Sequence, residues 1–174
     1  MLSRTGERAV TGHTQVATAL PAELVNKLQG YYLPWIREAL TTADDDLIWK
    51  RPNDGVNSIG NLLLHLEGNI RQWMIHGLGG EEDRRNRDAE FAANAGADKW
   101  TLFNALEATV DEACEVILQA RSDEDWLRPV IIQSFNTTPL NACIHVVEHF
   151  SYHTGQIVTM VRSATGADLH FYTL

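Results

Sequence analysis

Cysteine is scarce in this chain. Two residues, Cys114 and Cys143, occur among 174, and no C-x-x-C pair is present. Disulfide-stapled domains and zinc ribbons need more cysteines at closer spacing, so neither class fits this sequence. Two isolated cysteines are typical of a protein in a reducing compartment, and we expect a cytoplasmic location.

Long apolar runs are also missing. No stretch reaches the roughly 18 uninterrupted apolar residues from which a membrane-spanning helix is predicted. The first 20 residues contain arginines but no apolar segment of the kind found in secretory signals. We therefore expect a soluble protein without a membrane partner.

Positive charge is in short supply as well. The 14 lysines and arginines face 23 aspartates and glutamates, which gives a formal net charge of -9 at pH 7. Such a chain repels a phosphate backbone, so we expect no nucleic-acid partner. The dense basic run 84–87 is flanked on both sides by acidic residues. This pattern predicts a solvated loop whose charges pair with one another.

Apolar residues recur at spacings of three and four along much of the chain, the pattern of amphipathic helices. The helices predicted in this way span 21–40, 58–76, 100–120 and 139–164. Ser58 and the pair Thr138 and Pro139 are good helix starts, and Gly166 is a good stop. Pro34 predicts a kink in the first helix.

The remaining segments define the domain organisation. Residues 1–20 show no helical periodicity, and we treat them as an N-terminal leader that is either loose or docked on a single domain, 21–174. The stretch 126–135 is β-branched but interrupted by Pro129, so we expect it to be extended without forming a central strand. Four helices without alternating strands predict an all-α fold, an up-and-down four-helix bundle with long connections.

Three of the seven histidines lie at four-residue steps in HVVEHFSYHTGQI: His145, His149 and His153. At about 100° per residue, they project with Gln156 from one side of the helix, within an arc of about 80°. The apolar side chains of the same helix occupy a neighbouring arc. The histidine strip therefore borders the core.

The helix 58–76 repeats this arrangement, with His65 at the edge of its apolar stripe and Asn69 next to it on the wheel. Histidines four apart on a helix have Cβ atoms about 5–6 Å apart, so both rings can reach one ion. A third imidazole from the second helix would leave one coordination position for water or substrate, as in catalytic metal sites. His65 is the best-placed candidate for it.

Histidines with this spacing also occur as residues that only cap helices, form hydrogen bonds or border a core. His145 in particular fits a ligand, a group that orients a ligand or substrate, or a plain member of the polar strip. We favour the second interpretation.

Two segments carry a family resemblance: NSIGNLLLHLEGNIRQW, 57–73, and HVVEHFSYHTGQI, 145–157. They resemble the DinB-like superfamily, cytoplasmic four-helix bundles that include metalloenzymes related to bacillithiol transferases and mycothiol-dependent isomerases. The likeness extends over 21–166 and points to a branch without an assigned reaction. It implies His65, His149 and His153 as ligands of a divalent ion. Thr154 stands where many relatives have a basic residue.

The leading hypothesis is a metal-dependent enzyme that acts on a small molecule, by transfer of a low-molecular-weight thiol or by hydrolysis. A divalent transition metal, with Zn or Ni most expected, would generate a nucleophile at neutral pH. Other side chains are expected to orient the ligands or the substrate: His145, Glu148, Tyr152, Gln156 and Asn69.

Two alternatives stay open. One is a non-catalytic module for metal binding or oligomerisation, and since helical bundles often pair, we expect a homodimer in either case. The other takes HVVEH as the H-x-x-E-H motif of a metallopeptidase, with Glu148 as general base. That class needs a further acidic ligand downstream, where the sequence offers only Asp168.

Overall fold

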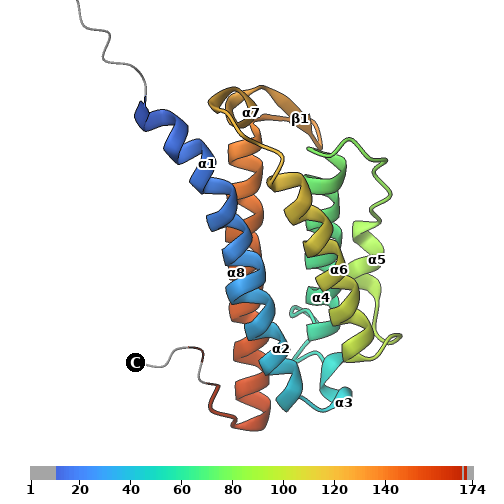
Figure 1. The fold of residues 1–174 in the computed structure, drawn as a ribbon. Coiled ribbons are helices and arrows are strands. Elements are labelled where there is room, and N and C mark those ends of the chain that lie inside the picture. Colours follow the sequence, from blue (N-terminus) through green and yellow to red (C-terminus); the bar gives the residue numbers. More distant parts are fainter. Residues whose placement is uncertain (1–10, 170, 172–174) are drawn as a thin grey trace, which may run out of the picture.

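The computed structural model describes residues 11–169 and 171, and its first helical stretch is longer than predicted (Figure 1). It consists of α1 (Thr11–Val25), the π-helical segment η1 (Asn26–Tyr32) and α2 (Leu33–Thr42). The predicted start at Pro21 is wrong, because α1 already includes the second half of the expected leader. Its first half is rich in Thr, Gly and Ala, and an apolar stripe of Ala17, Leu20, Pro21 and Leu24 packs against the core. The expected leader residues 1–10 lie outside the described residues.

Two prolines sit inside this stretch and change its hydrogen bonding. Pro21 has no amide hydrogen to donate to the carbonyl of Ala17. The indole Nε1 of Trp126 donates to that carbonyl instead, at 3.3 Å, and joins α1 to a distant part of the chain. Pro34 is the second residue after the π-helical segment, so the irregularity expected there takes the form of a wider helical turn.

The short helix α3 (Asp45–Ile48) leads to the second long stretch, α4 (Ile59–Ile70) and η2 (Arg71–His76). Ser58 caps α4 as predicted: its hydroxyl accepts a hydrogen bond from the Asn61 amide, and the Asn61 side chain accepts one from the Ser58 amide. Two polar side chains therefore accept hydrogen bonds from the backbone amides at the buried start of the helix.

The charged connection contains α5 (Arg87–Ala92), and α6 (Lys99–Ile117) follows, capped by Asp98. After α7 (Asp123–Leu127) come two short antiparallel strands, β1 (Val130–Ile132) and β2 (Phe135–Thr137). Gln133 and Ser134 in the turn both have positive φ, as a two-residue hairpin requires. The expected extended segment is confirmed from Val130 onward, while its first residues are helical.

The last helix, α8 (Pro139–Thr165), matches its predicted bounds to within one residue. The Thr138 hydroxyl accepts from the Asn141 amide at its start, and Gly166 ends it with a φ of 70°. The long helices pack side by side, and the described chain is all-α apart from the hairpin (Figure 1).

Helices α4 with η2 and α8 run antiparallel, which three contacts establish. The rings of Trp73 and His145 lie 4.3 Å apart between centroids, and the sulfur atoms of Met74 and Cys143 lie 3.8 Å apart. His65, earlier in α4, meets His153, later in α8, with 5.1 Å between ring centroids. Residue numbers therefore rise along one helix as they fall along the other.

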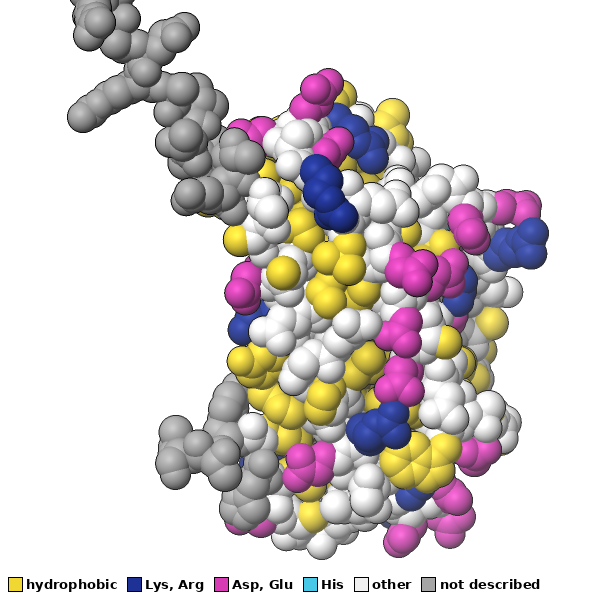
Figure 2. Space-filling model, viewed as in Figure 1, with side chains coloured by type: hydrophobic (Ala, Val, Ile, Leu, Met, Phe, Trp, Pro, Cys, Tyr) yellow, Lys and Arg dark blue, Asp and Glu magenta, His cyan; other side chains and the backbone are white. Residues whose placement is uncertain are grey.

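Acidic and basic side chains are interspersed on the face drawn in Figure 2, and the basic ones form no continuous patch there. This distribution agrees with the net charge of -9. Among the helices that the structure describes, none is both long and apolar enough to cross a membrane.

Candidate metal centre

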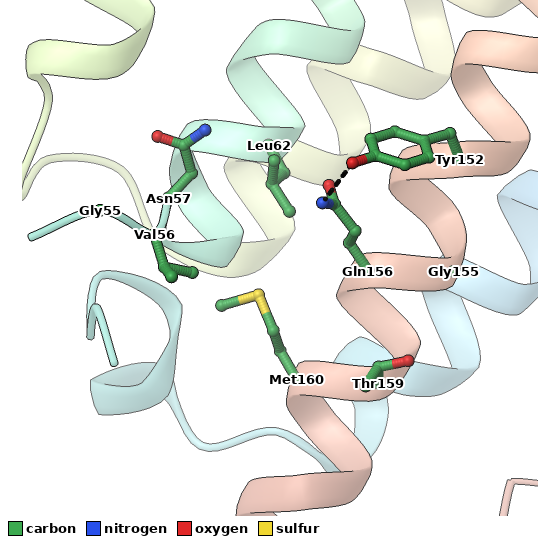
Figure 3. A pocket seen from close by; sticks show the side chains of 9 residues that line it. All are labelled: Gly55, Val56, Asn57, Leu62, Tyr152, Gly155, Gln156, Thr159 and Met160. Atoms are coloured by element: carbon green, nitrogen blue, oxygen red, sulfur yellow. Dashed lines mark hydrogen bonds between the residues drawn. The ribbon is translucent and has the colours of Figure 1, made fainter. Parts of the chain in front are cut away.

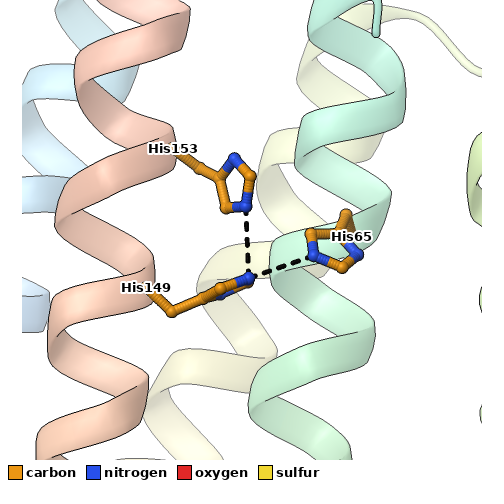
Figure 4. Close-up of side chains that lie close together, drawn as sticks. All are labelled: His65, His149 and His153. Atoms are coloured by element: carbon orange, nitrogen blue, oxygen red, sulfur yellow. Dashed lines mark hydrogen bonds between the residues drawn. The ribbon is translucent and has the colours of Figure 1, made fainter.

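Three imidazoles converge between α4 and α8. His149 Nε2 lies 3.0 Å from His65 Nε2 and 3.1 Å from His153 Nε2 (Figure 4). One nitrogen of each ring falls within 4.8 Å of the others. The structure thus brings together the three histidines that the sequence singled out.

The rings are well shielded from solvent. His65 is 6% exposed and His153 is 9% exposed. Burial, followed by the neighbouring imidazoles, lowers the pKa of His149 to about 3. Burial also lowers the pKa of His153, although its hydrogen bond with Gln156 acts in the opposite direction. Both rings are therefore neutral at pH 7, the form whose lone pair can bind a cation.

His65 is oriented by a buried ion pair from the 81–98 connection. Its Nδ1 lies 2.9 Å from Oε2 of Glu90, whose two carboxylate oxygens also accept from Arg85 at 2.7 and 2.9 Å. Burial acts to raise the pKa of Glu90, but the hydrogen bonds from Arg85 and His65 outweigh it and lower that pKa. Arg85 Nη2 also lies 3.0 Å from His65 Nδ1, but it already donates to Glu90 Oε2. Donation of the Nδ1 hydrogen to the ionised Glu90 places the His65 lone pair on Nε2, which faces the other two rings.

The segment that carries Glu90 is fastened to α4. The Asn61 side-chain amide donates to the carbonyls of Glu90 and Ala93, at 2.8 and 2.7 Å, and Arg51 donates to the carbonyl of Phe91. The ring of Phe91 packs on His65, with 4.7 Å between centroids. Glu90 is thereby held through its backbone and through its carboxylate.

Both Arg84 and Arg85 pair with acidic residues of the same connection, as predicted. The predicted exposure is correct for Arg84, whose side chain is 80% exposed, and wrong for Arg85, whose side chain is 6% exposed. Arg85 is buried because Glu90 neutralises it and Gln72 Oε1 accepts from its Nη1 at 2.9 Å. Sequence reasoning missed both Arg85 and Glu90. One signal was available in Gly68, because a glycine inside a helix often marks the close approach of another group.

Gln156 holds His153 in the same way as Glu90 holds His65. The Nδ1 of His153 donates to Oε1 of Gln156 at 2.7 Å, so its lone pair is also on Nε2. The amide nitrogen of Gln156 donates to the hydroxyl of Tyr152 at 3.2 Å. Gln156, which we expected to orient a ligand or the substrate, thus contacts His153 directly.

Of the other residues expected near the site, Asn69 is buried, whereas His145 and Glu148 lie outside the cluster of three histidines. Asn69 is buried, at 5% exposed, and its Oδ1 has no hydrogen-bond partner, as is also true of Nδ1 of His149. His145 lies outside the cluster of three and packs against Trp73, and Glu148 is exposed. Thr154 is buried and donates to the carbonyl of Phe150 at 2.8 Å, inside its own helix.

A pocket of about 610 Å³ begins at the edge of the cluster (Figure 3). Gln156 and Tyr152 form its boundary with the histidines, and Leu62, Val56 and Met160 give it apolar walls. Its lining also includes Gly55, Asn57, Gly155 and Thr159. None of these residues carries a charge.

The cluster suits a divalent transition metal. Three nitrogens about 2.0–2.1 Å from a common centre in tetrahedral arrangement lie about 3.3 Å apart, close to the two separations found between His149 and its neighbours. The His65 and His153 lone pairs already point inward. Three neutral imidazoles are borderline-soft donors that zinc and nickel accept.

Comparison with known proteins identifies one family. The family model described as a protein of unknown function (DUF1572) matches residues 23–174, which include all three histidines and Glu90. No curated protein matches the chain.

Proposed function

The chain belongs to DUF1572, a family of proteins of unknown function, and we propose that it is a divalent-metal-dependent enzyme that acts on a small molecule. The convergence of three Nε2 atoms from His65, His149 and His153 is the observation that carries the proposal. The antiparallel packing of α4 and α8 supports an up-and-down four-helix bundle of the DinB-like kind around this cluster.

The chain's own residues provide the holding and orienting groups. His65, His149 and His153 would be the ligands, with Glu90 and Gln156 fixing two of the rings through their Nδ1 hydrogens. Three protein ligands leave a coordination position for an exchangeable group. A bound divalent ion would supply Lewis acidity there, so that water or a thiol is a nucleophile at neutral pH.

The pocket beside Gln156 supports a small-molecule substrate. Its apolar walls and uncharged polar edge suit an uncharged part of a substrate, while the reacting group reaches toward the histidines. Hydrolysis and transfer of a low-molecular-weight thiol both use this arrangement. They differ in whether water or a thiol occupies the exchangeable position.

Metal content tests the proposal. Protein purified without a histidine tag is expected to hold about one equivalent of a divalent transition metal, which His65→Ala, His149→Ala and His153→Ala each lose. His76→Ala is a matched control, since this half-buried histidine bonds to the Glu81 carbonyl at the end of η2, away from the cluster. Equal, negligible metal in wild type and His149→Ala contradicts the proposal.

The visible absorption of cobalt-substituted protein separates an enzyme from a non-catalytic metal-binding module. An exchangeable position predicts that cysteine or 2-mercaptoethanol changes the cobalt spectrum and adds a sulfur-to-metal band. If neither a thiol nor a change of pH alters the cobalt spectrum, the result favours the non-catalytic module. The remote metallopeptidase hypothesis gains no support from His145, which packs on Trp73 outside the cluster.

The expected homodimer belongs to the proposal as well. Sedimentation equilibrium of the metal-loaded protein tests it directly, with the mass of 19.5 kDa for one chain as reference. A single species at that mass contradicts the dimer and leaves the metal site untouched.

A further inference from the structure

His149 is the one imidazole of the three whose Nδ1 lacks a partner. The reason follows from its neighbours. His65 and His153 each donate from Nδ1, to Glu90 and Gln156, and therefore present lone pairs at Nε2. Since His149 Nε2 lies within hydrogen-bond distance of both lone pairs, it carries the hydrogen, and its Nδ1 is left as a bare acceptor.

Asn69 presents a second bare acceptor, because its Oδ1 is buried without a hydrogen-bond partner. Buried polar atoms of this kind are uncommon and costly, so two of them require an explanation. Neither atom bonds to the other in this structure, so a contact between them requires a change in the Asn69 side-chain rotamer that turns Oδ1 toward the His149 ring.

The antiparallel register places these two residues at the same level. His65 and Trp73 of the α4 and η2 stretch meet His153 and His145 of α8, respectively. Asn69 lies midway between His65 and Trp73, and His149 lies midway between His153 and His145. Residues four apart share a helix face, so Asn69 and His149 face each other across the same interface.

We propose that Asn69 is the positioning residue for His149, and that its Oδ1 accepts the His149 Nδ1 hydrogen when the cluster holds a divalent ion. This inference rests on the proposed function. Ligation through Nε2 needs the lone pair on that atom, so the hydrogen of the neutral ring is then on Nδ1. One hydrogen leaves Nε2 and one is gained at Nδ1, with no net change in protons. The tautomer change turns two unpaired acceptors into a donor and an acceptor.

Each imidazole then has its own oxygen acceptor: Glu90 for His65, Gln156 for His153 and Asn69 for His149. The first two are in place without the ion. The contact between Asn69 and His149 forms when the ion binds, so that metal binding gives two unsatisfied buried atoms a hydrogen-bond partner at once. Asn69 thereby couples ion binding to the tautomer of a single ring.

Zinc affinity of apo protein, measured by competition with a chelator, tests the inference. Asn69→Leu is expected to bind zinc about ten- to a hundredfold more weakly than wild type, the usual loss when a partner of a metal-bound imidazole is removed. Asn69→Asp keeps an acceptor oxygen and is expected to retain the affinity. Asn104→Leu, at an exposed position of α6, is the matched control.

Two further readouts distinguish positioning from a structural contribution. In the absence of metal, Asn69→Leu is expected to unfold at the same urea concentration as wild type or at a higher one, since it removes an unpartnered buried oxygen. Nitrogen-15 NMR of the histidine rings is expected to report the His149 hydrogen on Nε2 in apo protein and on Nδ1 after zinc is added.

The outcomes separate this inference from the proposed function. Wild-type protein that binds no zinc overturns both. Zinc binding by wild type with an equal affinity in Asn69→Leu, or a His149 tautomer that zinc leaves unchanged, overturns the inference and leaves the metal centre standing. If metal-free Asn69→Leu unfolds at a lower urea concentration than wild type, Asn69 contributes to the stability of the fold, and the positioning inference is overturned.

Discussion

Gly68 in α4 lies directly against the carboxylate of Glu90, so that a methyl group at this position would overlap with Oε1 of that carboxylate. The oxygen belongs to a flexible side chain, but Arg85 donates to it and His65 contacts the other carboxylate oxygen, so the carboxylate is held in place. The glycine therefore allows a buried ion pair to reach the Nδ1 side of His65.

We expect Gly68→Ala to lower the free energy of unfolding by about 1–2 kcal/mol, because displacing Glu90 costs more than the helix gains from alanine. Zinc affinity is expected to fall as well, since His65 loses its acceptor. Gly155→Ala is the matched control in α8, where the added methyl meets open space and is expected to stabilise the helix by about 0.5–1 kcal/mol. Urea unfolding and zinc titration of both variants check this, and a Gly68→Ala protein as stable as wild type contradicts it.

Glu90→Gln keeps the shape of the side chain and removes its charge. The buried Arg85 guanidinium then lacks its counter-charge, and we expect a loss of stability of about 3 kcal/mol. Zinc is expected to bind about tenfold more weakly, because a neutral amide is a poorer acceptor for the His65 Nδ1 hydrogen.

Glu82→Gln provides the control for that variant. Its partner Arg84 comes from the same connection, but the pair is largely exposed, with 73% of the Glu82 side chain accessible. Exposed pairs of this kind contribute little, so the variant is expected to match wild type in urea unfolding and in zinc affinity. Equal losses of stability and of zinc affinity in Glu82→Gln and Glu90→Gln would mean that these losses come from the change in net charge, and not from the buried pair of Glu90 and Arg85.

The sequence was informative wherever local chemistry determines structure. Ser58, Thr138 and Gly166 fix helix ends through side-chain oxygens or a left-handed backbone, and these ends were predicted. A helical wheel also places His149 and His153 on one side of α8, since that depends only on spacing.

Contacts between distant segments were beyond such reasoning. Glu90 lies in a charged run that reads as solvated, and only the close approach allowed by Gly68 brings it to His65. The helical start at Thr11 was missed for a similar reason, because the apolar face of α1 begins only at Ala17, whose carbonyl accepts from the Trp126 indole more than a hundred residues away.

Asp98 makes part of the stability depend on pH. The hydroxyl and amide of Thr101, followed by the amide of Trp100, lower the pKa of this capping carboxyl. Because the folded pKa lies below the unfolded one, the stabilisation is complete above about pH 4 and disappears as pH falls through the folded pKa. In Asp98→Asn the cap remains without an ionisable group. The difference in urea midpoint between wild type and variant is therefore expected to shrink on acidification, and a difference that stays constant with pH argues against this assignment.

The pocket beside Gln156 is expected to prefer uncharged ligands. No Asp, Glu, Lys, Arg or His side chain lines it, so a charged group placed there loses hydration without gaining a partner. Hexan-1-ol and hexanoate carry the same tail and differ in charge, which makes them matched probes. We expect hexan-1-ol to shift the amide resonances of Gly55 and Gly155 at concentrations where hexanoate has no effect.

Met160→Trp fills the pocket, so it should abolish the response to hexan-1-ol and leave zinc affinity as in wild type. Equal responses to both probes, or an undiminished response in Met160→Trp, would rule out this pocket as the site for an uncharged part of the substrate.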